Sequence, residues 1–201
     1  MKTRLFLFLA AGMAALNSCT VTSSLYPLSS RPDQCIIKNE FSGIWYFKDD
    51  SSQLYSIDTL AKNSLHEYQI LCLDMDTTDT MADSVYFRAR LVQLHDSLYL
   101  DTYFELGKND KNNMDLELLT VTRHFIFRLH FISADTILFQ EPDPVGVISL
   151  IDKKKIHLTY AGLGEDNFLI LDKSEQLQKA ITESEKYKWL YKNTRLLIRV
   201  K

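Results

Sequence analysis

The sequence contains few of the residues that interrupt regular structure or cross-link small proteins. Its 201 residues include only six glycines, four prolines and three cysteines, which argues against a collagen-like, low-complexity or disulfide-dense chain. Basic residues are not in excess, because 23 Lys and Arg stand against 26 Asp and Glu. This balance leaves no electrostatic footprint for nucleic acid, so we expect no nucleic-acid partner.

Long apolar runs are also lacking beyond the N-terminus. No later stretch approaches the roughly 18 apolar residues that a membrane-spanning helix needs. The one marked apolar segment, residues 5–16, follows Lys2 and Arg4. It is too short to span about 30 Å of hydrocarbon. A basic start followed by a short apolar segment is typical of a secretory signal peptide.

The next residues, LNSC at 16–19, resemble the lipobox of bacterial lipoproteins. The resemblance implies that residues 1–18 are removed and that Cys19 receives a diacylglycerol and an acyl chain such as palmitate. Several acyl chains, at about 0.8 kcal/mol per buried methylene, hold a protein firmly on a bilayer. Because Thr20 stands where some inner-membrane lipoproteins carry Asp, we expect an outer-membrane anchor facing the periplasm. A plain signal peptide with an incidental cysteine is the alternative.

The mature chain divides by composition into a linker and one domain. Residues 19–39 are rich in Ser, Thr and Pro and predict a flexible, lipid-anchored tether. Residues 40–201 are long enough for one domain with its own core. Cys35 and Cys72 either form a disulfide or remain free, and their spacing does not indicate a metal site.

Alternating apolar and polar residues predict many short strands. Residues 85–94 and 97–105 both alternate and are separated by a turn at His95-Asp96, which predicts an antiparallel hairpin, apolar inside and polar outside. Residues 123–132 alternate in the same way. Further strands are expected at the first aromatic segment (41–47), 68–74, 135–140, 145–151, 155–161 and 167–172.

The periodicity changes near the C-terminus. Ser174 is a suitable N-cap for a helix within 174–193, and residues 194–200 predict a last strand. Many strands, one late helix and a final strand favour a mainly β fold, an antiparallel up-and-down barrel, because closure removes exposed edges.

Gly43-Ile44-Trp45, at the start of the first strand, matches the GxW motif of the lipocalin (calycin) families. Residues 40–201 resemble the bacterial lipocalin-like lipoproteins. The resemblance implies that Trp45 closes one end of an eight-stranded barrel and that an arginine near the C-terminus covers its ring. Arg195 and Arg199 are both candidates, and the spacing does not choose between them. A β-sandwich in which Trp45 is an ordinary strand residue is the alternative fold.

Two functions are compatible with this architecture. In the first, the barrel binds a small hydrophobic ligand in a cavity, without any cofactor. In the second, the core is solid and the protein acts through its surface, as an interaction or assembly partner of another envelope protein. The same interior side chains would line the cavity or fill the core: Phe87, Leu91, Phe125, Phe127 and Phe131.

One motif points to a different chemistry. Asp74, Asp76 and Thr78 match the hhhhDxDxT signature of haloacid-dehalogenase-type phosphatases, some of which are lipoproteins. That signature needs a parallel α/β sheet with several crossover helices, whereas the sequence predicts one late helix. We therefore interpret residues 75–84 as a polar connection between strands. We expect no enzyme activity and assign no catalytic or metal-binding residue; an anchored phosphatase remains the remote alternative.

Overall fold

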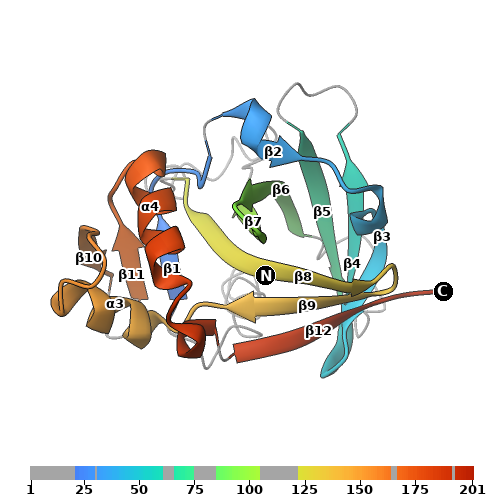
Figure 1. Cartoon of the computed structure of the whole chain (residues 1–201). Coiled ribbons are helices and arrows are strands. Elements are labelled where there is room, and N and C mark those ends of the chain that lie inside the picture. Colours follow the sequence, from blue (N-terminus) through green and yellow to red (C-terminus); the bar gives the residue numbers. More distant parts are fainter. Residues whose placement is uncertain are drawn as a thin grey trace, which may run out of the picture.

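The computed structural model describes residues 21–29, 31–60, 66–74, 85–104, 122–163, 167–191 and 193–201. Its main feature is a closed antiparallel β-barrel (Figure 1). The strands of the barrel are β3 Gly43–Phe47, β4 Asp50–Thr59, β5 Glu67–Asp74, β6 Val85–Leu94, β7 Ser97–Phe104, β8 His124–Ser133, β9 Thr136–Glu141 and β12 Asn193–Arg199.

Each strand of the barrel is antiparallel to both of its neighbours. Strands β3 to β9 follow one another around the wall, and β12 closes the ring between β9 and β3. Leu197 of β12 accordingly lies opposite Phe47 on one side and Ile137 on the other. The predicted up-and-down barrel with a C-terminal helix and a final strand is confirmed, and the β-sandwich alternative is wrong.

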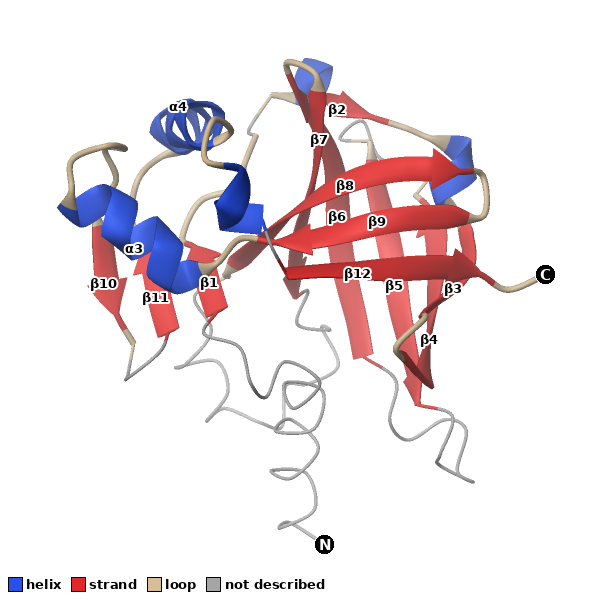
Figure 2. Cartoon of the chain, turned by 60° about the horizontal axis from the view of Figure 1, so that its bottom comes forward, coloured by secondary structure: helices blue, strands red, loops and turns tan. Residues whose placement is uncertain are grey.

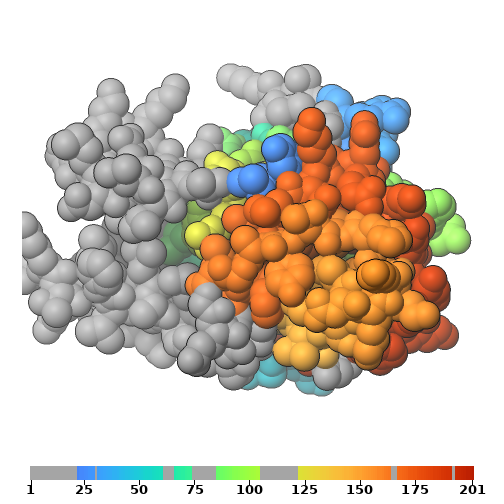
Figure 3. All heavy atoms as spheres, turned by 90° about the vertical axis from the view of Figure 1, so that its left-hand side faces the viewer, coloured from blue at the N-terminus to red at the C-terminus, as the bar shows by residue number. Residues whose placement is uncertain are grey.

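A second layer, here called the side layer, is built from both ends of the chain. β1 Val21–Ser24 pairs in parallel with β11 Asn167–Ile170 and antiparallel with β8, and β10 Tyr160–Gly162 pairs with β11. Two helices, α3 Pro144–Asp152 and α4 Ser174–Ser184, accompany these strands together with the 3-10 turn η3 Lys188–Tyr191. Figure 2 shows the side layer next to the barrel, and in Figure 3 its residues, in orange, make up much of one face.

The helix α3 corrects one prediction, because residues 145–151 were expected to form a strand. Asp143 has extended backbone, and Pro144 follows at the first position of the helix, where a missing N–H costs nothing. Val147 and Leu150 are then buried on one face at helical spacing. A short apolar run is ambiguous between strand and helix, and here the proline before it decides.

The segment expected to be a flexible tether also differs from the prediction. In its described part, β1 joins the sheet, and Leu28 and Ser29 are fully buried. The 3-10 turn η1 Pro32–Gln34, the strand β2 Cys35–Ile36 and the 3-10 turn η2 Asn39–Phe41 lead from there to β3. β2 pairs with β6, and Phe41 of η2 is buried in the barrel core. The packed unit therefore begins at least as early as Val21.

Two separate hydrophobic cores result from this arrangement. One fills part of the barrel and includes Trp45, Leu91 and Leu129. The other lies outside the barrel wall and includes Leu28, Tyr99 and Leu177. Parts of the β6–β7 wall are therefore buried on both faces. No helix among the described residues is long and apolar enough to cross a membrane.

Candidate functional site

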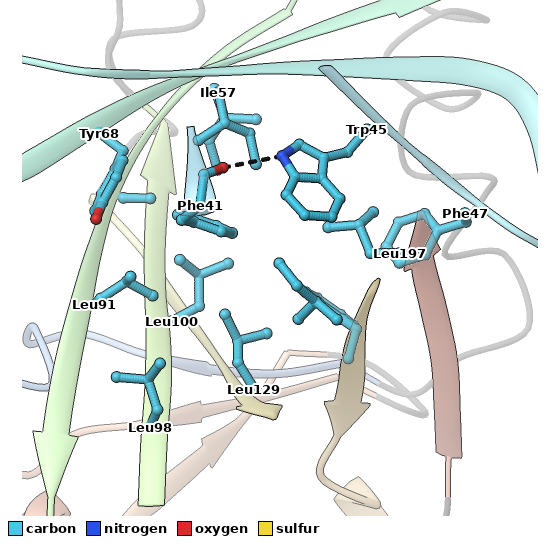
Figure 4. Close-up of a cluster of buried hydrophobic side chains, with 14 residues drawn as sticks. Phe41, Trp45, Phe47, Ile57, Tyr68, Leu91, Leu98, Leu100, Leu129 and Leu197 are labelled. Atoms are coloured by element: carbon cyan, nitrogen blue, oxygen red, sulfur yellow. Dashed lines mark hydrogen bonds between the residues drawn. The ribbon is translucent and has the colours of Figure 1, made fainter. Parts of the chain in front are cut away.

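One end of the barrel, here called the closed end, is built around Trp45. The indole is fully buried, and its Nε1 donates a hydrogen bond of 2.9 Å to the carbonyl oxygen of Phe41 (Figure 4). The guanidinium carbon of Arg199 lies 4.4 Å from the ring centroid. A guanidinium over an indole face is a favourable cation–π contact. The indole ring is thus held at its edge by the hydrogen bond and over one face by the guanidinium group.

Arg199 also joins separate parts of the closed end. It donates hydrogen bonds to the carbonyl oxygens of Ser42, at 2.7 Å, and Ala134, at 3.1 Å, and also to that of Glu40. These acceptors belong to the segment before β3 and to the β8–β9 turn. The planar fork of an arginine can serve several acceptors at once, which a lysine cannot do in the same geometry.

Gly43 leaves the space that the guanidinium group of Arg199 occupies beside Trp45. Its φ of +141° lies in a region that residues with a side chain rarely adopt. A Cβ at this position would also collide with Nη1 of Arg199. The glycine and the tryptophan of the GxW motif therefore act together with Arg199.

Arg195, the other candidate, has a different place. Its guanidinium carbon lies 3.8 Å from the ring centroid of Phe47, and its Nε is 2.9 Å from a carboxylate oxygen of Asp49. Arg195 therefore belongs to the opposite end of the barrel. The structure distinguishes the two arginines where their spacing in the sequence could not.

Beneath Trp45 the interior is filled by side chains from around the ring. Phe41 packs edge-on against Tyr68, with ring centroids 5.0 Å apart, and both side chains are almost completely buried. Burial raises the pKa of Tyr68, whose hydroxyl oxygen accepts a hydrogen bond of 2.7 Å from the backbone N–H of Lys38. Other buried members of this layer are Ile57, Ala89, Leu91, Leu100, Ile137 and Leu197.

The opposite half of the interior, here called the open half, is less completely buried. Phe104 at the end of β7 is 42% exposed, and Phe87 and Phe125 are half-buried. The ring of Phe104 lies 4.5 Å from that of Phe87 and 6.4 Å from that of Phe125, centroid to centroid. Phe127, also half-buried, lies 4.5 Å from Phe139. These rings form an aromatic lining that remains partly accessible.

The five side chains predicted to line a cavity are divided between the two halves. Leu91 is fully buried, and Phe131 packs against Phe41 of the closed end at 6.2 Å between centroids. Phe87, Phe125 and Phe127 belong to the open half. Phe41 and Tyr68, which fill the closed end from before β3 and from β5, are not among the predicted interior residues.

Polar groups accompany the aromatic lining of the open half. Glu141 follows the buried residues Ile137 and Phe139 at period two on β9, so it shares their face of the strand. Burial raises the pKa of the Glu141 carboxyl group, and Arg195 acts in the opposite direction. A partly desolvated carboxyl group thus lies at the rim of an otherwise apolar interior.

The outer wall carries a buried polar row, whereas alternation in the sequence predicts solvent-exposed polar side chains on this face. Arg90 binds Glu67 through Nε at 2.9 Å and Nη2 at 2.6 Å, and the Tyr103 hydroxyl donates to the same carboxylate oxygen at 2.8 Å. Burial raises the pKa of Tyr103 to about 12. The row stands in register across neighbouring strands, since Arg90 lies opposite both Glu67 and Asp101.

Asp101, fully buried, holds the N-terminal segment to this wall. One of its carboxylate oxygens accepts a hydrogen bond of 2.8 Å from the backbone N–H of Leu28, and the other lies 2.8 Å from Nδ1 of the buried His124. A buried carboxylate needs such partners, because desolvation without them is costly. The row is therefore best explained as structural.

A partly open cavity lies outside the barrel, beside the side layer. It has a volume of about 50 Å³, and its mostly apolar lining includes Val147 of α3, Leu177 of α4 and Ile170 of β11, together with His124 and Ser24. A water needs at least about 10–15 Å³, so the space suits a few small molecules and not a lipid chain.

The remaining predicted residues fall into two groups. Cys19, Asp76 and Thr78 lie outside the described residues, and Asp74 ends β5 in an antiparallel sheet, not the parallel α/β sheet that the phosphatase signature needs. No disulfide joins the buried Cys35 to Cys72 of β5, so the disulfide alternative does not hold in this structure. No three His, Cys, Asp or Glu side chains are grouped to hold a metal ion within the described parts of the chain.

Comparison with known proteins gives no match: no family model, no curated protein and no solved structure is significantly similar to this chain. The fold is therefore defined by its strand pairing and by the geometry of the closed end. It is a closed barrel of eight antiparallel strands with a tryptophan-plugged end, consistent with a calycin-like fold.

Proposed function

We propose that this protein is a lipocalin-like lipoprotein of the bacterial envelope, anchored through Cys19, whose barrel binds a small hydrophobic ligand in its open half. One observation carries the ligand proposal. The interior aromatic side chains are sealed at the closed end, where Trp45 is fully buried, and partly exposed at the other, where Phe104 is 42% exposed. Eight strands give a barrel just wide enough to be filled by side chains or to hold one small ligand.

The free energy that apolar burial can supply limits the kind of ligand. Covering about 200 Å² of apolar surface, at about 25 cal/mol per Å², contributes about 5 kcal/mol. Association itself costs at least about 4 kcal/mol in lost translational and rotational freedom. A very small apolar molecule would gain almost nothing, so the proposed ligand has an extended apolar part that reaches Phe87 and Phe125. No catalytic role is assigned to Asp74.

A charge placed in the open half tests this function. The chain from Thr20 to Lys201 is titrated with a fluorescent fatty acid, beside Phe104→Asp in the lining and Ile132→Asp as control. Ile132 is 56% exposed on β8 near the closed end, so its variant adds the same charge away from the lining. We expect saturable binding that Phe104→Asp weakens at least about tenfold, or about 1.4 kcal/mol, and Ile132→Asp leaves unchanged.

The outcomes separate the parts of the proposal. Absence of saturable binding by the unmodified chain contradicts the ligand function, and equal weakening by both variants contradicts the assigned location. The anchor is checked independently by fractionating cells that express Cys19→Ala. We expect that variant to leave the membrane fraction, because it lacks the acylated sulfur, and unchanged membrane attachment contradicts the lipoprotein assignment.

A second candidate function, interaction with another envelope protein, has one observation in its favour. Val145 is exposed at the start of α3, and Trp189, in η3, is 47% exposed while packing over the neighbouring Gly146. Tryptophan is enriched among residues that dominate protein interfaces. Loss of partner capture on Trp189→Ala, with ligand titration unaffected, would favour this second function.

A further inference from the structure

The position of β1 determines how an anchored form of the protein meets its membrane. We propose that the end of the side layer where β1 begins lies directly against the lipid bilayer, so that the open half of the barrel faces the membrane surface. This inference rests on the proposed lipid anchor at Cys19. It goes beyond that anchor because it assigns a lipid-contacting surface and an orientation.

The first step is the length of chain between anchor and fold. Val21 is already in the sheet, in register with Asn167 of β11. One residue, Thr20, lies between Cys19 and Val21, and two steps along an extended chain span at most about 3.6 Å each, or about 7 Å in all. A flexible tether of the expected length, about 20 residues, would instead have a root-mean-square span of about 25 Å. The fold is therefore held at the bilayer and cannot stand off from it.

The second step is which surface this places at the lipid. The backbone N–H of Leu163 donates a hydrogen bond of 2.8 Å to the carbonyl oxygen of Asn167, the residue paired with Val21. With neighbouring strands about 4.8 Å apart, Leu163 lies roughly 10 Å from the start of β1. Its side chain is 39% exposed. An apolar side chain so close to the acylated residue is well placed to enter the headgroup region.

The third step extends the surface to the barrel. Figure 2 shows the start of β1 on the lower side of the molecule, together with the ends of β5, β7 and β10 and the start of β6. Phe104 and Val85, both partly exposed, stand at those ends of β7 and β6. Apolar exposure alone does not choose this end, because Ile132 and Ile44 are exposed near the closed end. The position of the proposed anchor is the observation that favours the end with Phe104 and Val85.

Fluorescence quenching by lipid tests the orientation in the acylated full-length protein. Leu163→Trp, Phe104→Trp and the control Ile132→Trp are each made in a Trp189→Phe background, in which the buried Trp45 gives a constant signal. The proteins are reconstituted in phosphatidylethanolamine–phosphatidylglycerol vesicles with and without brominated acyl chains. We expect at least about twofold stronger quenching of the new tryptophan at 163 than at 132, with 104 also above 132.

A variant with a longer linker tests whether the short distance between the anchor and β1 causes the orientation. About 15 Gly and Ser residues inserted between Thr20 and Val21 should bring quenching at 163 down toward that at 132, because the fold is then released from the surface. Protein that does not stay with the vesicles overturns the anchor and this inference together. Vesicle-bound protein with equal quenching at 163 and 132, or with quenching that the linker does not change, overturns the orientation alone. Ligand titration is independent of all these outcomes.

Discussion

The two ends of the barrel are built on different principles. The closed end depends on a few residues with particular geometry: Gly43 at positive φ, Trp45 buried, and Arg199 bound to three carbonyl oxygens around it. The open half depends on a set of aromatic rings, of which Phe87 and Phe104 are only partly covered. One end is a fixed plug, and the other retains apolar surface that something else can cover.

This difference shows how one barrel can be stable and still keep part of its apolar interior accessible. Stability is concentrated where burial is complete, in the layer of Phe41, Trp45 and Tyr68. The second core, between the barrel wall and the side layer, adds a support that leaves the interior untouched. The open half can therefore keep exposed rings without endangering the fold.

The largest expected effect comes from removing the plug. Trp45→Ala deletes a fully buried indole together with its hydrogen bond to Phe41 and its contact with Arg199. Such truncations cost about 3–5 kcal/mol, a large share of the 5–15 kcal/mol that stabilises a domain. Trp189→Ala, at a half-exposed position, should cost about 1 kcal/mol or less.

Urea unfolding of the chain from Thr20 to Lys201, followed by far-ultraviolet circular dichroism, measures both free energies of unfolding. A loss of under about 1 kcal/mol on Trp45→Ala would show that the closed end is not a plug. Similar losses for the two variants would remove the energetic contrast between Trp45 and an exposed tryptophan.

A smaller effect is expected at Gly43. Gly43→Ala places a Cβ against Arg199 and forces a backbone conformation that costs of order 1–3 kcal/mol in residues other than glycine. Gly162→Ala is the matched control, because a Cβ there meets nothing within 4 Å. We expect a loss of about 2 kcal/mol for Gly43→Ala and under about 0.5 kcal/mol for the control in the same urea titrations. Equal losses of stability for Gly43→Ala and Gly162→Ala would mean that replacing any glycine in a strand has this effect, and that the contact with Arg199 is not the cause.

Much of the barrel could be predicted from the sequence because it depends on local alternation. The strand at Val85–Leu94 was predicted with its bounds, and the interior face of β6 with Ala89 and Leu91, because one face of each hairpin is buried. The buried polar row was not predicted. Asp101 binds the N–H of Leu28, which is 73 residues earlier in the chain. No periodicity within β7 shows that a distant segment will cover its outer face.

The division of the candidate site into two halves was also beyond the sequence. Alternation places Leu91 and Phe87 on the same face of β6, yet Leu91 is sealed and Phe87 half-buried. What separates them is the plug formed by Phe41, from a 3-10 turn, and by Tyr68, from β5. Phe41 and Tyr68 are 27 residues apart in the sequence, so their contact depends on tertiary folding and not on local periodicity. Similarly, the Ser- and Thr-rich composition of 20–39 concealed the pairing of β1 with β11.

The smallest expected effect concerns pH and the open half. Burial raises the pKa of Glu141 above its ordinary value of 4.5 in the folded protein. The folded state therefore binds this proton more tightly than the unfolded state, and the contribution of Glu141 to stability falls as pH rises through its folded pKa. Glu141→Gln keeps the shape of the side chain and removes the ionisation. We expect a gain in stability for Glu141→Gln over the parent chain at pH 7 that shrinks toward pH 4, measured as the difference in urea midpoints.

Glu175→Gln, in the first turn of α4, is the control for loss of one carboxylate elsewhere. A difference between Glu141→Gln and parent that does not vary with pH, or that grows as pH falls, would place Glu141 in solvent and remove it from the rim of the open half.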